Sequence, residues 1–270
     1  RIFQIARVFR DGEVTDVHHP EFTLLEWYRA WTGLEEILVD TERLVRGLVG
    51  AEATIVERTV DGRQSRKVEL DLPFRRMTMQ ELVGEACDFD ILECLDYASL
   101  WQAVAEGGHL EGNFGRRHPP PDSGAPGRWD ELFFELMVTA IEPHLATLGA
   151  VFVTEWPAEL AILARKSDED PRVAHRAELY VGGVELANGF DELTDPDEQR
   201  QRFEEDLAER RRLGKPELPM PEDLLEALEY GLPPSSGIAL GLDRLQMLRM
   251  GVPRIDQTAP FAHVPKLREA

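Results

Sequence analysis

A carboxylate and a phenol near the start of the chain carry the first chemical signal. Residues 21–31 are aromatic and apolar, and the two-residue period of a strand places Phe22, Leu24, Glu26 and Tyr28 on one face. Strands that pack on a core seldom keep a charge on such a face without a partner. This face therefore predicts a site for a cationic ligand.

Cationic and aromatic residues gather around the loop before this strand. Arg10 ends a predicted strand over the first nine residues, and His18, His19, Glu21 and Phe22 begin the next one. In an antiparallel pair these side chains come within reach of one another. Because a guanidinium makes paired, charge-assisted hydrogen bonds to phosphate, this end of the pair suits phosphate binding. A surface arginine is the alternative interpretation.

Two carboxylates lie on a second predicted hairpin, with Gly182-Gly183 as its turn. In this register Tyr180 lies opposite Glu185, and Glu178 lies diagonally beside Glu185 on the same face. Mg²⁺ commonly takes one or two carboxylates plus substrate phosphates, so the pair suits a magnesium site. A solvated strand face is the alternative.

Three further polar or aromatic residues follow on the same strand, namely Asn188, Phe190 and Glu192. Regular alternation places them on the face opposite Glu185. A β-bulge near Asn188-Gly189 is needed to bring both sets into one site.

A glycine-rich strand before a helix completes the set. Gly237, Ala239 and Gly241 alternate along residues 236–242, and Arg244 projects from the first turn of the helix that follows. Small residues at alternate positions let another group approach the backbone closely, so the segment could hold a triphosphate tail. Close packing of the helix is the alternative.

These residues require a mixed set of elements to position them. Periodicity and turn residues predict helices at 34–49, 79–87, 129–148, 195–213, 221–230 and 243–250, and strands at 1–9, 21–31, 52–72 (a hairpin), 150–154, 177–181, 184–193 and 236–242. A long Gly-, Pro- and His-rich loop is expected at 107–128. Without internal repeats or linkers, this pattern predicts one α+β domain with a largely antiparallel sheet.

Composition limits the classes of function. The chain has 270 residues, of which 43% are hydrophobic, and its formal net charge is −21, from 30 basic and 51 acidic residues. Extensive contact with nucleic acid is disfavoured by this charge. Two cysteines without metal-like spacing indicate a reducing compartment. No apolar run or leader predicts a membrane or secreted protein, so we expect a cytoplasmic location.

Three segments together resemble the motifs of a known family. Phe9-Arg10, Gly12-Glu13, His18, residues 20–23 (PEFT) and residues 25–29 (LEWYR) resemble motif 2 of class II lysyl-tRNA synthetases, and most closely that of the short paralogues that ligate (R)-β-lysine to elongation factor P. Residues 185–195 (ELANGFDELTD), followed by Gln199, Arg202 and Phe203, are similar to the same paralogues. Residues 236–244 (SGIALGLDR) resemble motif 3.

The resemblance implies a class II catalytic fold, an antiparallel sheet flanked by helices. It also implies a reaction in which an amino-acid carboxylate attacks the α-phosphate of ATP. ATP contacts are implied for Arg10, Glu13, His18, Phe22 and Arg244, with Arg10 and Arg244 as the catalytic arginines. Amino-acid contacts are implied for Glu26, Tyr28, Asn188, Phe190, Glu192 and Ala239. Glu178 and Glu185 are implied to hold Mg²⁺.

Ala239 favours the paralogues, because they have alanine where ordinary lysyl-tRNA synthetases have glycine. One methyl group in a close pocket discriminates by about 1–3 kcal/mol. The implied substrates are (R)-β-lysine and a lysine side chain of elongation factor P, while tRNA is disfavoured by the −21 charge. There are two alternatives. One is a lysine–tRNA ligase. The other is a catalytically silent binding module, which is favoured by His19 in place of the family's asparagine.

The start of the chain suggests one further expectation. Residue 1 is arginine and lies directly inside a strand pattern. We therefore expect residues 1–270 to be a single class II catalytic domain without its N-terminal part, where motif 1 of the family lies. The resemblance implies a homodimer for the complete protein.

Overall fold

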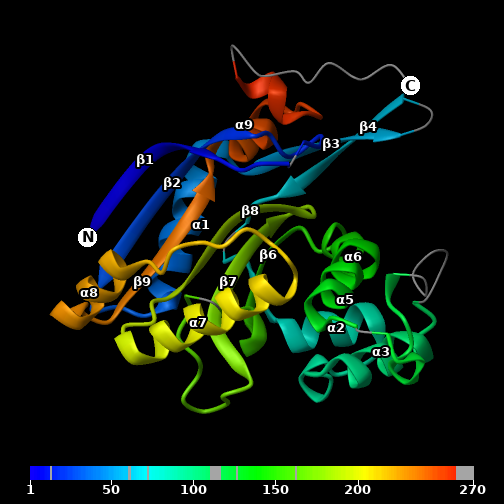
Figure 1. The fold of residues 1–270 in the computed structure, drawn as a ribbon. Helices are drawn as coiled ribbons and strands as arrows, with labels where there is room; N and C mark the ends of the chain where they lie inside the picture. Colours follow the sequence, from blue (N-terminus) through cyan, green and yellow to red (C-terminus); the bar gives the residue numbers. More distant parts are fainter. Residues whose placement is uncertain are drawn as a thin grey trace.

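A twisted seven-stranded sheet forms the centre of the protein, as the computed structural model shows (Figure 1). The structure describes residues 1–12, 14–59, 62–71, 73–109, 117–125, 127–161 and 163–259. In order across the sheet, the strands are β1 (Ile2–Phe9), β2 (Glu21–Ala30), β9 (Ser235–Gly241), β8 (Val184–Asp191), β7 (Val173–Val181), β6 (Ala150–Pro157) and β5 (Arg75–Thr78). All neighbours are antiparallel except β5 and β6. The α+β class and the antiparallel sheet are therefore confirmed.

One face of the central strands packs against two helices. Helix α1 (Leu34–Val49) and helix α9 (Leu242–Met250) form an apolar core there with alternate residues of β9, β8 and β7. Ile238 and Leu240 point into this core, and Trp27 of β2 packs on its margin. Because side chains alternate along a strand, Glu26, Tyr28, Gly237 and Ala239 are directed to the other face.

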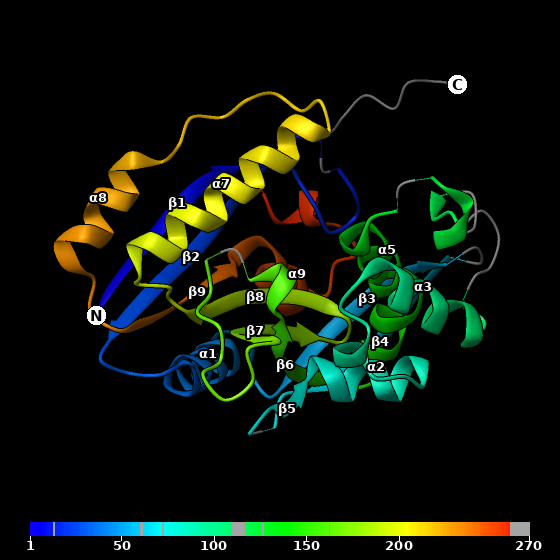
Figure 2. The same cartoon turned by 60° about the horizontal axis from the view of Figure 1, so that its bottom comes forward.

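A second core forms at the β5–β6 side of the sheet. Figures 1 and 2 show α2, α3, α5 and α6 gathered there, away from β1. These helices are α2 (Met79–Cys87), α3 (Tyr97–Glu106), α5 (Trp129–Leu136) and α6 (Glu142–Leu145), and a π-helical turn, η3 (Met137–Ile141), joins the last two. Phe133 and Trp156 pack edge to face within this core, with ring centroids 6.3 Å apart.

The remaining elements lie around the sheet and its two cores. They are the hairpin β3 (Glu52–Thr59) and β4 (Gly62–Glu69), the helices α7 (Pro196–Arg212) and α8 (Glu222–Gly231), and the short helices η1 (Ile91–Glu93), η2 (Pro121–Ser123), η4 (Ala158–Leu160) and η5 (Ile255–Thr258). Arg200 of α7 pairs with Glu222 of α8 at 2.7 Å.

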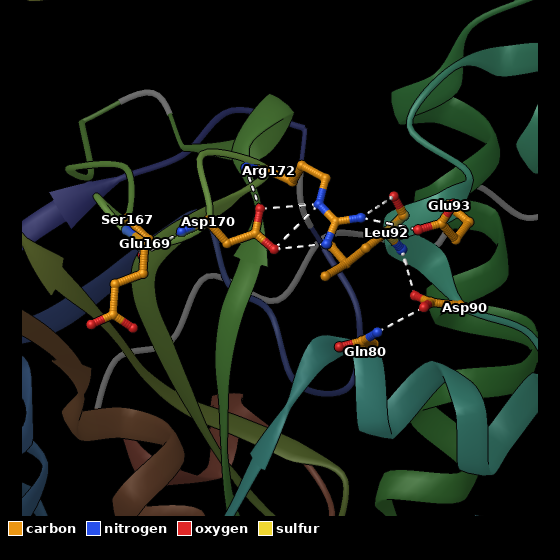
Figure 3. Close-up of polar contacts among 8 residues, drawn as sticks. All are labelled: Gln80, Asp90, Leu92, Glu93, Ser167, Glu169, Asp170 and Arg172. Carbon is orange, nitrogen blue, oxygen red and sulfur yellow. Dashed lines mark hydrogen bonds and ion pairs between the residues drawn. The ribbon is translucent and has the colours of Figure 1, made fainter.

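An irregular segment, residues 158–172, connects β6 to β7 and lies beside the end of β8. The backbone of Leu163 accepts a hydrogen bond from Leu193 N–H at 3.0 Å, and Arg165 N–H donates to Asp191 at 2.9 Å. Arg172 closes the segment by binding Asp170 and reaching across to Glu93 at 3.0 Å (Figure 3). Arg172 therefore joins the segment to η1, and Arg165 joins it to β8.

Local sequence signals account for most element ends. Thr78 and Glu81 form the predicted capping box of α2, and the Asp195 side chain accepts from Asp197 N–H and Glu198 N–H at the start of α7. Gly182 and Gly183 both adopt positive φ angles, +56° and +82°, as a tight two-residue hairpin turn requires.

The sequence-based predictions missed several elements. Strand β5 is only four residues long and pairs in parallel with β6, a distant segment, so local periodicity carried no signal for it. Helix α3 and η1 were also missed. Of the predicted 107–128 loop, residues 110–116 and 126 lie outside the described residues, and the described remainder includes η2.

Gly189 supplies a test of the close contact between β8 and β9. A Cβ atom at this position would lie 2.5 Å from the Gly237 carbonyl oxygen and 2.7 Å from the Ile238 Cβ. Gly189→Ala should therefore destabilise the protein by about 1–3 kcal/mol through overpacking. The measurement is the free energy of unfolding from chemical denaturation.

Gly47→Ala is the matched control, because Gly47 lies in α1 and a Cβ there meets nothing within 4 Å. It should stabilise the helix by about 0.5–1 kcal/mol. Equal effects of the two substitutions would contradict the proposed contact.

Candidate active site

A cavity of about 390 Å³ opens over the face of the sheet that carries Glu26 and Tyr28. Its walls come from β2, β8, β9, the β1–β2 loop and the start of α9. Eleven of the sequence-predicted site residues line it, namely Arg10, His18, Phe22, Glu26, Tyr28, Glu185, Asn188, Phe190, Glu192, Ala239 and Arg244. Glu178 lies outside this lining, and Glu13 lies outside the described residues.

The register of four strands brings these side chains together. Glu26 of β2 pairs with Ala239 of β9, which pairs with Asn188 of β8, which in turn pairs with Glu178 of β7. Residues aligned in this way share one face, so the row runs continuously along the floor of the cavity. A site residue from one end of the chain is therefore placed beside residues more than 150 positions later.

A second row runs parallel to the first, two residues further along each strand. Tyr28 pairs with Gly237, which pairs with Phe190, and Phe190 pairs with Arg176. A Cβ at position 237 would lie 2.3 Å from the Tyr28 ring and 3.0 Å from Glu192 Oε1. The absence of a side chain at Gly237 thus makes room for both groups.

A β-bulge places Glu185 on the same side as Asn188. Leu179 pairs with Ala187 and Tyr180 pairs with Glu185, so Leu186 is the extra residue of β8. The need for a bulge and the Tyr180–Glu185 pairing are confirmed, but the predicted position near Asn188-Gly189 was wrong. Asn188 and Gly189 are held in regular register by β9, so the irregularity falls nearer the hairpin turn, beyond that pairing.

Burial makes the Tyr28 end of the cavity favourable for a cation. The pKa of Glu192 is raised to about 7, chiefly by burial and further by the charge of Asp191. The pKa of Tyr28 is also raised, first by burial and then by the charges of Glu192 and Glu26. An ammonium group bound here would relieve these repulsions.

The other end of the cavity carries cationic and aromatic groups. The Arg10 guanidinium lies over the Phe22 ring, 5.8 Å from its centroid. Arg244 donates through Nε to the Val17 carbonyl at 3.1 Å and through Nη1 to the Glu185 carbonyl at 2.8 Å. His18 contacts Thr15 through Nδ1 at 2.8 Å. This set could bind an anion and stack on a flat ring.

An anchored aspartate holds the start of α9 against β2. Asp243 Oδ2 accepts the Thr23 N–H at 2.6 Å, which joins the helix that carries Arg244 to the strand that carries Phe22. This contact fixes the relative position of two residues at the anion-binding end.

Glu178 lies at the β7 end of the first row, beside the cavity lining, in a network of donors. Its carboxylate accepts from Arg176 at 2.6 Å, Tyr180 at 2.6 Å and Asn188 at 3.0 Å. Burial is the largest cause that raises its pKa to about 7, and the charge of Glu185 adds to the rise. The Arg176 charge and the hydrogen bonds act in the opposite direction.

Glu178 and Glu185 are the two predicted Mg²⁺ residues. Among the described residues, no group of three or more His, Cys, Asp or Glu side chains is placed to hold a metal ion. Glu185 lies on the cavity wall and Glu178 lies beside the lining, and the Glu185 charge also raises the pKa of Glu142, for which burial is the main cause. A divalent cation would offset this crowding of negative charge, so the two predicted carboxylates fit such a site.

Sequence reasoning missed several residues that line the cavity. Leu163, Asp243 and Ile255 all contribute to its wall. Leu163 comes from the irregular 158–172 segment, which carries no periodic signal. Asp243 precedes Arg244 directly, and its position in the first turn of a helix was the available signal.

Comparisons with known proteins give a consistent result. Residues 1–265 match the model of the family described as tRNA synthetases class II (D, K and N). The chain is 37% identical over 260 residues to the elongation factor P–(R)-β-lysine ligase of Proteus mirabilis, covering 96% of this chain and 70% of that protein. The Edwardsiella ictaluri protein of the same name is also 37% identical, with coverages of 97% and 71%. A lysine–tRNA ligase of a Psychrobacter species is 34% identical, and 49% of its length is covered.

The buried carboxylate of Glu192, at the Tyr28 end of the cavity, predicts a pH effect. The ordinary pKa of 4.5 rises to about 7 for Glu192 in the folded protein. The contribution of Glu192 to the free energy of unfolding is therefore fully favourable below about pH 4.5 and is lost as the pH rises through 7. The free energy of unfolding of the wild type should fall relative to that of Glu192→Gln by up to ~3 kcal/mol over this window.

Denaturant titrations of both proteins between pH 4 and 8 measure this difference. Glu178 titrates in both proteins, so the comparison isolates Glu192. A constant difference across the window would contradict the raised pKa.

Proposed function

The chain belongs to the class II tRNA synthetase family (D, K and N), and from this premise we propose that it is an ATP-dependent ligase. It activates (R)-β-lysine as an adenylate and transfers it to a lysine side chain of elongation factor P. The observation that carries this proposal is the single cavity with a cationic, aromatic end and a buried, carboxylate-rich end. The names of the relatives support the choice of substrates.

At the cationic end, we assign the nucleotide to Arg10, His18, Phe22 and Arg244. The Phe22 ring can stack on the adenine, and the guanidinium of Arg10, which lies over this ring, can bind phosphate. Arg244 is held by two backbone carbonyls, so its guanidinium costs little additional ordering when a phosphate binds. Glu13 is assigned to the nucleotide from the sequence motif alone.

At the acidic end, we assign the side-chain ammonium of the amino acid to Glu26, Tyr28 and Glu192. Phe190 lies in the row beside Tyr28, and Asn188 lies between the two ends, next to Ala239. From this order we infer that the carboxyl group of the amino acid lies toward the α-phosphate of ATP.

In the first step, a carboxylate oxygen of the amino acid attacks the α-phosphorus of ATP. The bond from the α-phosphorus to the bridging oxygen breaks, and pyrophosphate leaves. In the second step, the amine of the acceptor lysine attacks the activated carbonyl carbon, an amide forms, and AMP leaves as the amine loses a proton. The protein's part is positioning and charge stabilisation, with Arg10 and Arg244 as the catalytic groups at the phosphates.

Glu185 and Glu178 are the residues that would hold Mg²⁺ together with phosphate oxygens. The ion supplies charge neutralisation at the phosphates when bound. Because the acceptor is a translation factor, we place the reaction in the cytoplasm. Among the described helices, none combines the length and hydrophobicity needed to cross a bilayer.

The decisive experiment is incubation of the protein with ATP, (R)-β-lysine and elongation factor P. We expect the intact mass of elongation factor P to increase by one β-lysyl group, with the modification on one lysine side chain. Omission of ATP is the control. An unchanged mass under all conditions would contradict the proposal.

A lysine–tRNA ligase is the second candidate, favoured by the 34% identity to the Psychrobacter protein. It predicts charging of tRNA with lysine in a parallel reaction. The net charge of −21 weighs against this candidate. Exclusive modification of the protein acceptor would remove it.

Ala239 should discriminate between amino acids, because it lies between Glu26 and Asn188 on the cavity floor. Ala239→Gly removes one methyl group and should change the ratio of kcat/KM for (R)-β-lysine and L-lysine by about 10–200-fold, in favour of L-lysine. Amino-acid-dependent exchange of pyrophosphate into ATP measures both ratios. An unchanged ratio would show that Ala239 has no part in specificity.

A further inference from the structure

Arg176 lies on β7, beside the cavity lining and on the same face of the sheet, and contacts four groups. Its guanidinium donates to Glu178 at 2.6 Å, to the Leu160 carbonyl at 2.8 Å and to Asn188 Oδ1 at 3.3 Å. The same group stacks on Trp156, with Cζ 4.5 Å from the ring centroid. The Arg176 side chain is 18% exposed, and it does not line the cavity.

The Arg176–Glu178 pair fixes the orientation of the Asn188 amide. Asn188 Oδ1 accepts from Arg176 Nε, while Asn188 Nδ2 donates to Glu178 Oε1 at 3.0 Å. A rotation of the amide by half a turn would direct its oxygen at the Glu178 carboxylate and its N–H groups at the guanidinium. Both contacts would then be repulsive, so the ion pair permits one orientation only.

This orientation determines what Asn188 offers to a ligand. The amide has two N–H groups, of which one is used by Glu178. Within the part of the chain that the structure describes, the second N–H has no hydrogen-bond acceptor in the protein. Since Asn188 lines the cavity, its wall presents a donor to an oxygen atom of a bound molecule.

We propose that Arg176 is a positioning residue that, with Glu178, sets the Asn188 amide to donate to an oxygen of the bound amino acid. The inference rests on the proposed function, because the oxygen belongs to the amino acid to be activated. Arg176 itself touches no substrate. Its effect therefore passes through Asn188 and concerns the amino acid rather than ATP.

Arg176→Met tests this inference, since methionine keeps an apolar stem against Trp156 but removes every donor. We expect the KM for (R)-β-lysine in pyrophosphate exchange to rise about tenfold, as expected for one hydrogen bond. The KM for ATP, measured at saturating amino acid and Mg²⁺, should stay within twofold. A comparable rise in the KM for ATP would overturn the proposal.

The double variant with Asn188→Ala separates positioning from folding. If Arg176 acts through Asn188, Arg176→Met should have no further effect on the amino-acid KM in the Asn188→Ala background. A multiplicative effect of the two substitutions would refute the route through Asn188. Arg176→Lys replaces the methionine variant if that variant fails to fold. Lysine keeps a charge for Glu178 without the planar fork, so Arg176→Lys should raise the KM for the amino acid by less than tenfold.

Arg172→Met is the matched control. Arg172 precedes the same strand and binds Asp170, Glu93 and the Leu92 carbonyl (Figure 3). It does not line the cavity. Arg172→Met should leave the KM for the amino acid unchanged. If the wild type shows no exchange with any lysine analogue, the proposed function fails; if it is active and Arg176→Met behaves like Arg172→Met, only this inference fails.

Discussion

The site depends on the register of β9 between β2 and β8. This register aligns Glu26, Ala239, Asn188 and Glu178 in one row and Tyr28, Gly237 and Phe190 in the next. A shift by one residue would move every side chain of β9 to the other face, exchanging Ala239 for the core residues Ile238 and Leu240. The burial of Ile238 and Leu240 against α1 and α9 therefore holds the cavity floor in place. The same hydrophobic contacts that stabilise the fold determine the geometry of the site.

The two ends of the cavity differ in charge, and the protein maintains this difference by burial and by anchoring. Glu192 carries a raised pKa because it is removed from water, which makes a cationic ligand favourable at one end. Arg244 is fixed by backbone carbonyls, and Arg10 by its stack on Phe22, at the other end. A molecule with an ammonium group at one end and phosphates at the other matches this distribution. Such complementarity favours the covalent adduct of a basic amino acid with AMP.

The parts of the fold that could be predicted are those with strong local patterns. Helix α1 was predicted with its observed bounds because its apolar period and Gly50 are both local signals. The faces of β2 followed from simple alternation, and the Gly182-Gly183 turn set the register that pairs Tyr180 with Glu185. The position of the β8 bulge could not be predicted, because it depends on how β8 pairs with β7 and β9 together. Strand β5 was missed for the same reason, since its partner β6 lies far along the chain.

The candidate site shows the same division. Eleven of the residues predicted from the motifs meet in one cavity, although most were open to a structural interpretation when taken alone. Glu178 was predicted on the same face as Glu185, but its enclosure by Arg176, Tyr180 and Asn188 follows from tertiary packing that a strand pattern does not contain. Leu163 reaches the cavity from an irregular segment, where its position depends on the backbone hydrogen bond from Leu193 N–H.

The proposed function requires one cavity to bind the nucleotide and the basic amino acid side by side. Calorimetric titration with a non-hydrolysable sulfamoyl analogue of β-lysyl adenylate measures this directly. We expect one binding site per chain, with the analogue displaced by ATP and also by (R)-β-lysine. An analogue that competes with only one of the two substrates, or with neither, would contradict a shared cavity.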